Sequence, residues 1–269
     1  MPLVVLLLLV ATGLHAQSIN TRMGARASGM AYASFALIDD HSIFNNVAAL
    51  AWGTSTAAGF AYDLSPTLPG GDRASASLLI PVGDGSLGAG VFRFGDDTYS
   101  EQLISAGYAH RIATTSLGIK ANIVQYRAGG FETRHAVTVD FGGLMKITPE
   151  WTVAAGLFNL SQAALIEGEL LPVVFVAALS WSQVKGPLLA VEFEKHLGLP
   201  LRIKLGAEIP LYKKLFLRTG LGQNPISASG GIGARMHKLS LDFSTTYNQA
   251  FGLSYQASAG YRITKSSTR

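Results

Sequence analysis

The chain has 269 residues, a formal net charge of +4 and no cysteine, so it has no disulfide framework. Hydrophobic residues make up 48% of it and charged residues only 14%, whereas an average soluble domain carries about 25% charged residues. The small positive charge comes without a basic stripe or an aromatic platform, so nucleic acid is not implied as a partner.

Residues 1–16, MPLVVLLLLVATGLHA, are predicted to be a secretory signal peptide that is cleaved after Ala16. An uncleaved membrane anchor is the alternative, but the apolar run is shorter than the roughly 20 residues of a spanning helix. The most apolar later stretch, Leu170–Leu179, is also short and contains Pro172. Only helices and closed barrels satisfy their backbone hydrogen bonds in lipid, so an exported, apolar chain without spanning helices predicts a transmembrane β-barrel.

Residues 17–53 are rich in small side chains and do not alternate between apolar and polar positions. From Ser42 onward apolar residues recur at helical spacing, which predicts a short helix. Asp39, Asp40 and His41 precede it and suggest two hypotheses. One carboxylate caps the first turn of the helix, where free N–H groups attract an anion, or the cluster binds a metal ion.

Residues 54–263 alternate between apolar and polar side chains, as in Leu253–Ile263, and residues 264–269 form a tail. The pattern predicts an all-β fold, an antiparallel barrel of about 14 strands. A soluble sandwich also alternates, but the signal peptide, the low charge and the aromatic residues near strand ends favour the barrel. The predicted strands are 54–62, 73–82, 86–95, 102–112, 115–127, 133–146, 151–159, 172–182, 186–196, 201–210, 213–222, 226–236, 238–247 and 252–263.

The even strand number predicts that both termini lie on the periplasmic side, with tight turns there and longer loops outside. Gly83–Gly88 has the spacing of a dinucleotide-binding fingerprint, but a strand follows it, so a hairpin turn is predicted. The histidines show no metal-ligand spacing, and no serine or histidine constellation points to catalysis. Neither a metal ion, a cofactor nor an enzymatic activity is therefore predicted.

Charged residues of both signs occupy the face opposite the apolar one and are predicted to line the lumen. They are expected to pair with one another and to narrow a barrel that is already smaller than the 16–18-stranded diffusion porins. A structural network of ion pairs is favoured over a specific ligand site. These residues are Lys120, Arg134, Asp140, Lys146, Glu192, Glu194, Arg202, Lys204, Glu208, Arg218, Arg235, Asp242 and Arg262.

The N-terminal segment resembles the signature of PorV/PorQ-type proteins, which belong to the FadL-like group of outer-membrane barrels. The stretch that carries the resemblance contains Gly24, Arg26, Gly29, Met30, Asp39, Asp40, Asn45 and Asn46, with Ala48, Leu50 and Ala51 after them. The sequence departs from the signature at Ala31, Asn46 and Ala49, where the family has Gly, Pro and Gly. The resemblance implies a fourteen-stranded barrel whose N-terminal residues form a plug, anchored to the wall by Arg26, Asp39, Asp40, Asn45 and Asn46.

The resemblance also implies an outer-membrane protein of a Gram-negative-type bacterium that contacts lipid and acts in type IX secretion or cell-surface protein assembly. Its partners would then be secretion-system proteins or secreted substrates. The alternative is a FadL-like transporter of small hydrophobic molecules. A transporter should show an apolar pocket beside the plug and a kink or bulge in a wall strand, whereas a scaffold should show a sealed lumen.

Overall fold

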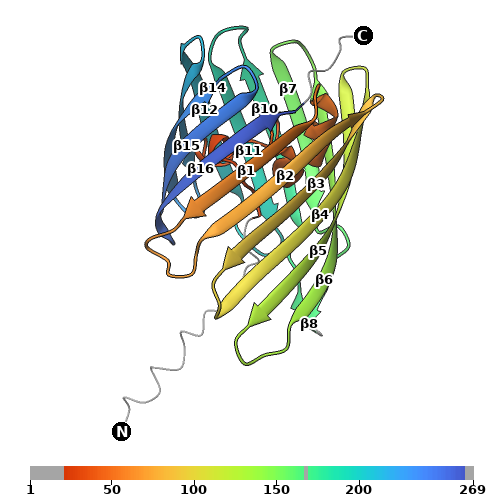
Figure 1. The fold of residues 1–269 in the computed structure, drawn as a ribbon, viewed down its shortest axis with the longest axis vertical. Coiled ribbons are helices and arrows are strands. Elements are labelled where there is room, and N and C mark those ends of the chain that lie inside the picture. Colours follow the sequence, from red (N-terminus) through yellow and green to blue (C-terminus); the bar gives the residue numbers. More distant parts are fainter. Residues whose placement is uncertain (1–20, 167–168, 264–269) are drawn as a thin grey trace.

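The computed structural model describes residues 21–166 and 169–263, so the predicted signal peptide 1–16 and tail 264–269 lie outside the described residues. Within the described part, fourteen antiparallel strands close into a barrel, as predicted (Figure 1). The strands are β1 Ala57–Leu64, β2 Arg73–Val82, β3 Gly85–Gly95, β4 Tyr99–Ile112, β5 Thr115–Ala128, β6 Arg134–Lys146, β7 Trp151–Phe158, β10 Val174–Ser182, β11 Leu188–His196, β12 Arg202–Tyr212, β13 Leu215–Gly222, β14 Ser227–Arg235, β15 Leu239–Asn248 and β16 Gly252–Arg262.

The barrel closes where β1 pairs with β16, from Ala57 opposite Arg262 to Leu64 opposite Tyr255. Closure removes the exposed sheet edges that would otherwise offer unpaired N–H and C=O groups. Two short strands that were not predicted, β8 Ala164–Ile166 and β9 Glu169–Leu170, form a separate hairpin between β7 and β10. The glycine-rich stretch after β2 is the predicted hairpin turn, at Gly83 and Asp84.

The two ends of the barrel differ in their connections. One end, called here the long-loop end, has connections that include 65–72, 129–133 and 159–173. The other, the short-turn end, has turns such as 83–84, 113–114 and 213–214. Outward side chains along the strands are mostly apolar, for example Ile104 and Val137, each 60% exposed. Successive side chains of a strand point to opposite faces, so most polar and charged side chains of the strands point inward, together with apolar ones that face the plug.

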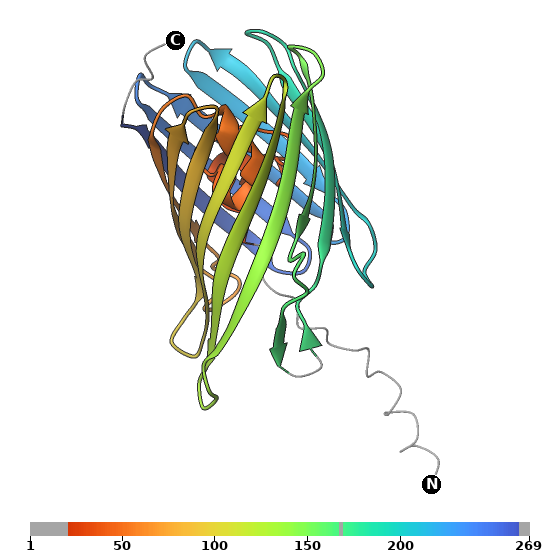
Figure 2. The same cartoon turned by 90° about the vertical axis from the view of Figure 1, so that its right-hand side faces the viewer.

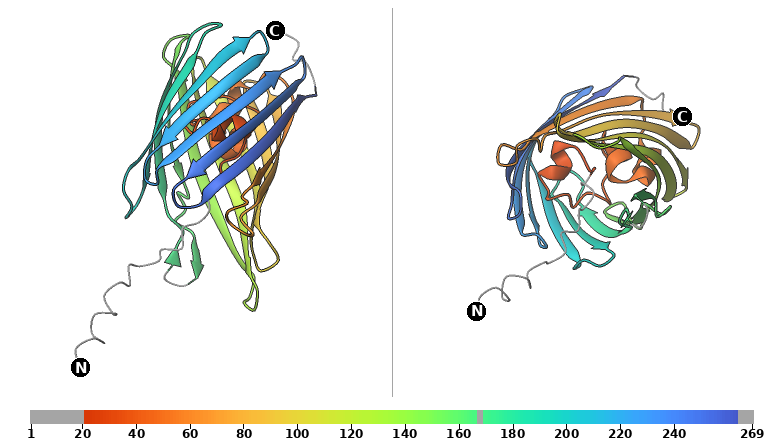
Figure 3. Two further views of the ribbon diagram at one scale, coloured as in Figure 1. Left: turned by 90° about the vertical axis from the view of Figure 1, so that its left-hand side faces the viewer. Right: turned by 90° about the horizontal axis from the view of Figure 1, so that it is seen from below.

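The N-terminal residues fill the lumen as a plug, seen as red and orange helices inside the barrel (Figures 2 and 3). The plug contains α1 Ala25–Ser28, α2 Ser42–Asn45 and a 3₁₀ helix, η2 Val47–Trp52. Its apolar side chains, such as Phe44 and Leu50, pack against inward residues of the wall and form the main hydrophobic core. No helix of the described residues is long and apolar enough to cross a membrane.

The helix predicted from Ser42 begins there, but it lasts only one turn before η2 takes over. The capping prediction is wrong, because His41 is the N-cap residue and no side chain caps the helix. Asp39 instead accepts a hydrogen bond at Oδ1 from the backbone N–H of His41, at 2.9 Å, which makes a local turn before the helix. Asp40 points to the wall and accepts one at Oδ2 from Ser240 Oγ, at 2.8 Å. Among the described residues no group of three or more acidic or histidine side chains is arranged to hold a metal ion.

Candidate functional site

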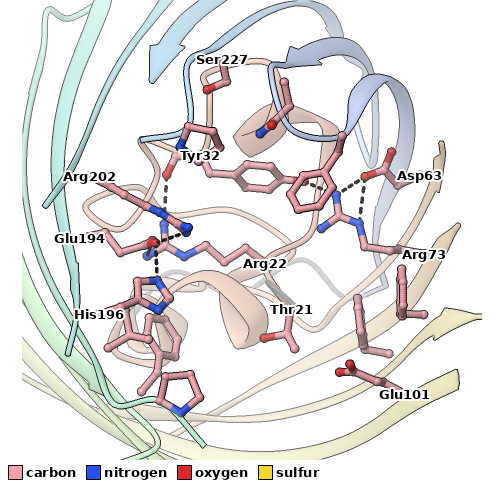
Figure 4. Close-up of a pocket in the computed structure, with 18 of the residues that line it drawn as sticks. Thr21, Arg22, Tyr32, Asp63, Arg73, Glu101, Glu194, His196, Arg202 and Ser227 are labelled. Atoms are coloured by element: carbon pink, nitrogen blue, oxygen red, sulfur yellow. Dashed lines mark hydrogen bonds and ion pairs between the residues drawn. The ribbon is translucent and has the colours of Figure 1, made fainter. Parts of the chain in front are cut away.

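A cavity of about 390 Å³ lies in the lumen between the plug and the long-loop end (Figure 4). The first described residue, Thr21, is part of its lining, together with Arg22 and Tyr32 of the plug. Buried apolar side chains of β3, β4 and β5 line one wall: Phe92, Phe94, Leu103, Val124 and Tyr126. We call this cavity the lumen pocket.

The apolar wall of the lumen pocket results from a change in the alternation, which β5 shows within one strand. In its first part Ile119 and Ile123 face outward while Lys120 and Asn122 are buried inside. In its last part Val124 and Tyr126 are buried inside while Arg127 is exposed. An apolar inner face with a polar outer face is the arrangement of a sheet that packs on a core and meets water outside. The strand ends at the long-loop end therefore extend past the apolar band and enclose an apolar space.

A buried ion network on β11 and β12 fixes the plug below the pocket. Glu192 is fully buried and forms an ion pair with Arg22 of the plug. Its other oxygen accepts hydrogen bonds from the backbone N–H groups of Ser34 and Phe35, at 3.1 and 2.9 Å. Lys204 Nζ lies 3.1 Å from Glu192 Oε1 on the neighbouring strand. Glu192 thus binds the plug through both a side chain and the backbone.

Glu194 continues this network to the surface of the lumen pocket. It lies 2.6 Å from Lys204 Nζ, 3.3 Å from Arg202 Nη1 and 2.9 Å from His196 Nε2 (Figure 4). Arg22 Nη2 is 3.6 Å from the same carboxylate. Because a buried charge is stable only with partners, these pairs account for the charges on this side of the pocket.

A second network holds the plug nearer the short-turn end. Arg26 forms a bidentate pair with Glu208, with both N–O distances at 2.9 Å. Arg218 Nε lies 2.6 Å from Glu208 and its Nη1 lies 2.8 Å from Asp242. Arg235 Nη1 also lies 2.8 Å from Asp242. One plug cation is therefore bound into a chain of alternating charges on four strands.

Two further wall groups contact the plug. Lys120 Nζ lies 3.0 Å from both the Ile43 carbonyl oxygen and Asp140 Oδ2, and so joins α2 to β5 and β6. On the opposite side, Arg73 pairs with Asp63 and donates a hydrogen bond to the Tyr32 hydroxyl at 2.9 Å. These contacts place fixed polar groups on two sides of the apolar wall.

Most of the predicted lumen residues lie in the two networks around Glu192 and Glu208 or in the Lys120–Asp140 pair. Arg134 and Arg262 do not, and their prediction is corrected. The Arg134 side chain is 53% exposed and lies 3.7 Å from Glu132 of the adjoining loop, and Arg262 is exposed at the end of β16. Both alternate in step with the inward residues of their strands, but they lie at the strand ends, beyond the enclosed lumen. Lys146 is half-buried and lies over the ring of Trp52.

The other plug residues of the signature act within the plug or by close packing. Asn45 and Asn46 donate hydrogen bonds to the carbonyl oxygens of Met23 and Phe35, at 2.9 and 2.8 Å. Gly24 has a φ of 106°, which favours glycine. The remaining two, Gly29 at the end of α1 and Met30, lie against Gly231 and against Gly206 and Gly220 of the wall, respectively.

Several pocket residues were not predicted: Arg22, Tyr32, Asp63, Arg73, Glu101 and His196. The alternation of β1 could have predicted Asp63, because the strand continues two residues past its predicted end and places Asp63 at an inward position. Arg22 had none, since its partner Glu192 is 170 positions away in the sequence.

The barrel wall is interrupted beside the lumen pocket. β7 ends at Phe158 and pairs with β6 only over Phe141–Lys146. The long-loop half of β6 is instead contacted by the following loop, where the Leu160 N–H donates to the Val139 carbonyl at 2.7 Å. Phe158, Asn159, Leu171 and Pro172 around this interruption line the pocket. A register shift also occurs in β12 near its end, between Pro210 and Tyr212.

No protein-family model matches the sequence, and no curated protein matches it. Solved structures do resemble the fold. A structure described as "CymD monoaromatic hydrocarbon channel" superposes with a TM-score of 0.73 at 15% identity. The alignment covers 91% of this chain and 98% of the channel's chain. A FadL homologue of Pseudomonas aeruginosa gives 0.66 at 13% identity, covering 90% and 98%. The toluene transporter TodX of Pseudomonas putida gives 0.60 at 10% identity, covering 82% and 92%. At these identities the comparisons show a FadL-like barrel fold, and they give no support to the narrower PorV/PorQ resemblance.

Proposed function

We propose that this chain is a non-enzymatic outer-membrane channel that passes small hydrophobic molecules. The observation that carries the proposal is the lumen pocket, with its apolar wall above a plug. An apolar pocket with a few fixed polar groups is the usual form of a small-molecule site. The described functions of the similar barrels, hydrocarbon and toluene channels, agree with it.

The size and charge of the pocket favour a small, neutral ligand. A cavity of about 150 Å³ holds benzene, so about 390 Å³ has room for a compound of one or two rings. The charged residues of the lining are four basic and four acidic: Arg22, Arg73, Arg202 and Lys204 against Asp63, Glu101, Asp140 and Glu194. An ionic headgroup would have to disrupt these buried pairs, at a cost that a neutral molecule avoids.

A molecule could leave the lumen pocket by two routes, along the lumen past the plug or sideways through the barrel wall. The plug would have to move for a straight route through the lumen, which requires breaking the contacts of Glu192 and Glu208. The interruption beyond Phe158 offers a sideways route that leaves the plug in place. An apolar pocket and an irregular wall strand are what we expect of a transporter. No observation specifically favours the secretion role, so transport is our proposal.

Uptake of radiolabelled toluene by cells that produce the protein, in a host without such a channel of its own, tests this function. Leu103→Trp should fill the pocket and lower uptake at least tenfold, because Leu103 is buried in its wall. Ile104→Trp is the matched control, since the adjacent side chain is 60% exposed on the outer face. Both variants should assemble, as judged by heat-dependent mobility on a gel. Wild-type uptake no faster than that of cells without the protein would refute the proposed function.

A further inference from the structure

A second cavity, of about 540 Å³, lies on the outer face of the barrel, away from the lumen pocket. Its lining is almost entirely apolar and comes from β12–β16, the blue strands of Figure 3 (left), and from β1. Large exposed side chains border it, among them Phe60 and Tyr62 on β1 and Leu241 and Phe243 on β15. Between them, the outward side chains that β16 contributes to the lining are those of Ala257 and Ala259. We call this cavity the outer groove.

The strand register explains the groove. Ala259 lies opposite Phe60 on one side and Leu241 on the other, and Ala257 lies in the same way between Tyr62 and Phe243. Small side chains between two rows of large ones leave a hollow over Ala257 and Ala259. Its lining continues across the strands to Ala234 on β14 and Leu215 on β13. On a barrel in a membrane this face meets acyl chains.

The short-turn end of the groove leads to a cluster of basic residues, which we call the basic rim. It consists of Lys213, Lys214, His237, Lys238 and Arg262, all exposed. Backbone hydrogen bonds join these turns to each other: Arg235 N–H to the Lys214 carbonyl and Arg262 N–H to the Lys238 carbonyl, each at 2.8 Å. Leu215 and Ala234, which line the groove, adjoin Lys214 and Arg235 directly.

The turns of the basic rim carry positive charge only. Within the described residues none of its side chains forms an ion pair, and the turns that carry it contain no acidic residue. Asp84 after β2 and Glu150 before β7 lie on other turns of the short-turn end, and Asp40 of the plug lies on the inner side of the wall, where it contacts Ser240. A positive rim next to an apolar groove complements a molecule with a negative headgroup and a hydrocarbon chain.

We propose that the outer groove and the basic rim bind an anionic glycerophospholipid of the leaflet at the short-turn end, with one acyl chain in the outer groove and the phosphate at the basic rim. Basic clusters at a membrane surface attract anionic lipids, and each lysine or arginine adds to the affinity. This site is separate from the lumen pocket, and it does not depend on what the channel carries.

Native mass spectrometry of the detergent-purified protein tests the proposal, with added palmitoyl-oleoyl phosphatidylglycerol or phosphatidylcholine as probes. We expect one phosphatidylglycerol bound about tenfold more tightly than phosphatidylcholine. The Lys214→Glu, Lys238→Glu variant should lose this preference while still assembling, because both side chains are exposed.

Ala259→Trp should abolish retention by filling the groove. Its control is Ala106→Trp, an outward alanine on β4, where the adjoining turn at residues 113 and 114 carries no charge. Equal retention of the two lipids by the wild-type protein, or undiminished retention by the lysine variant, would overturn the proposal. Preferential retention of lipopolysaccharide over phosphatidylglycerol would overturn it as well, because it would assign the site to the other anionic lipid.

Discussion

The contacts of Glu192 predict how firmly the plug is held. Its carboxylate is fully buried and faces Arg22, Lys204 and two backbone N–H groups of the plug. Glu192→Gln keeps the shape but removes the charge, so that two buried cations share Glu194 alone. Breaking a buried ion pair in this way costs about 3–5 kcal/mol. If that cost falls on the docked plug, the equilibrium for undocking shifts by about two to three and a half powers of ten.

Single-channel recording in planar bilayers measures this shift as the fraction of time the channel is open. The matched control is Glu132→Gln, because that side chain is 86% exposed and its pair with Arg134 is at the surface. Exposed pairs contribute little, so the control should behave as the wild type. An assembled Glu192→Gln protein with wild-type openings would show that this network does not hold the plug.

Other contacts of the plug lead to further predictions with the same recording. Gly118→Ala should increase openings, because a Cβ there would lie 2.9 Å from the backbone nitrogen of Ala48, whereas Gly129→Ala, with its nearest atom at 3.5 Å, should not. Equal behaviour of the two glycine variants would argue against tight packing of η2 on the wall. Asp40→Ala removes the bond to Ser240 and should raise the open fraction about ten- to a hundredfold, since a hydrogen bond to a charged group contributes about 1.5–3 kcal/mol. Asp39→Ala removes only a turn bond inside the plug and should have a smaller effect, so a larger one would contradict the assigned anchor.

The secretion and transport hypotheses differ in what they require of the lumen. A scaffold needs no interior space, whereas this barrel encloses a cavity with an apolar wall, beside an interruption of the barrel wall. The cavity exists because inward residues of β3–β5 become apolar near the long-loop end, at Phe94, Leu103 and Tyr126. The same change leaves polar residues such as Gln102 and Arg127 on the outside. Each of these strands therefore has an apolar outward face along most of its length and an apolar inward face near the long-loop end.

The alternation of the sequence was sufficient to predict the barrel and its fourteen wall strands. Successive side chains of a strand must point to opposite faces, so the sequence alone predicts that Ile119 faces outward and Lys120 faces the lumen. The same rule failed for Arg134 and Arg262, because parity gives the face of a residue and not its depth along the barrel. At the long-loop end of β5 the inward residues Val124 and Tyr126 are apolar. In the sequence alone this change only interrupts the alternation and does not indicate an apolar cavity.

The partners of the buried charges were decided only by the tertiary structure. Glu192 and Lys204 are directly opposite on neighbouring strands, a pairing that depends on the register of β11 and β12. The position of Arg22 beside Glu192 depends on how the plug folds back into the closed barrel. Alternation is set by covalent geometry within each strand and can be read locally. The lumen pocket, the plug contacts and the outer groove arise from packing between segments far apart in the chain, which no local pattern encodes.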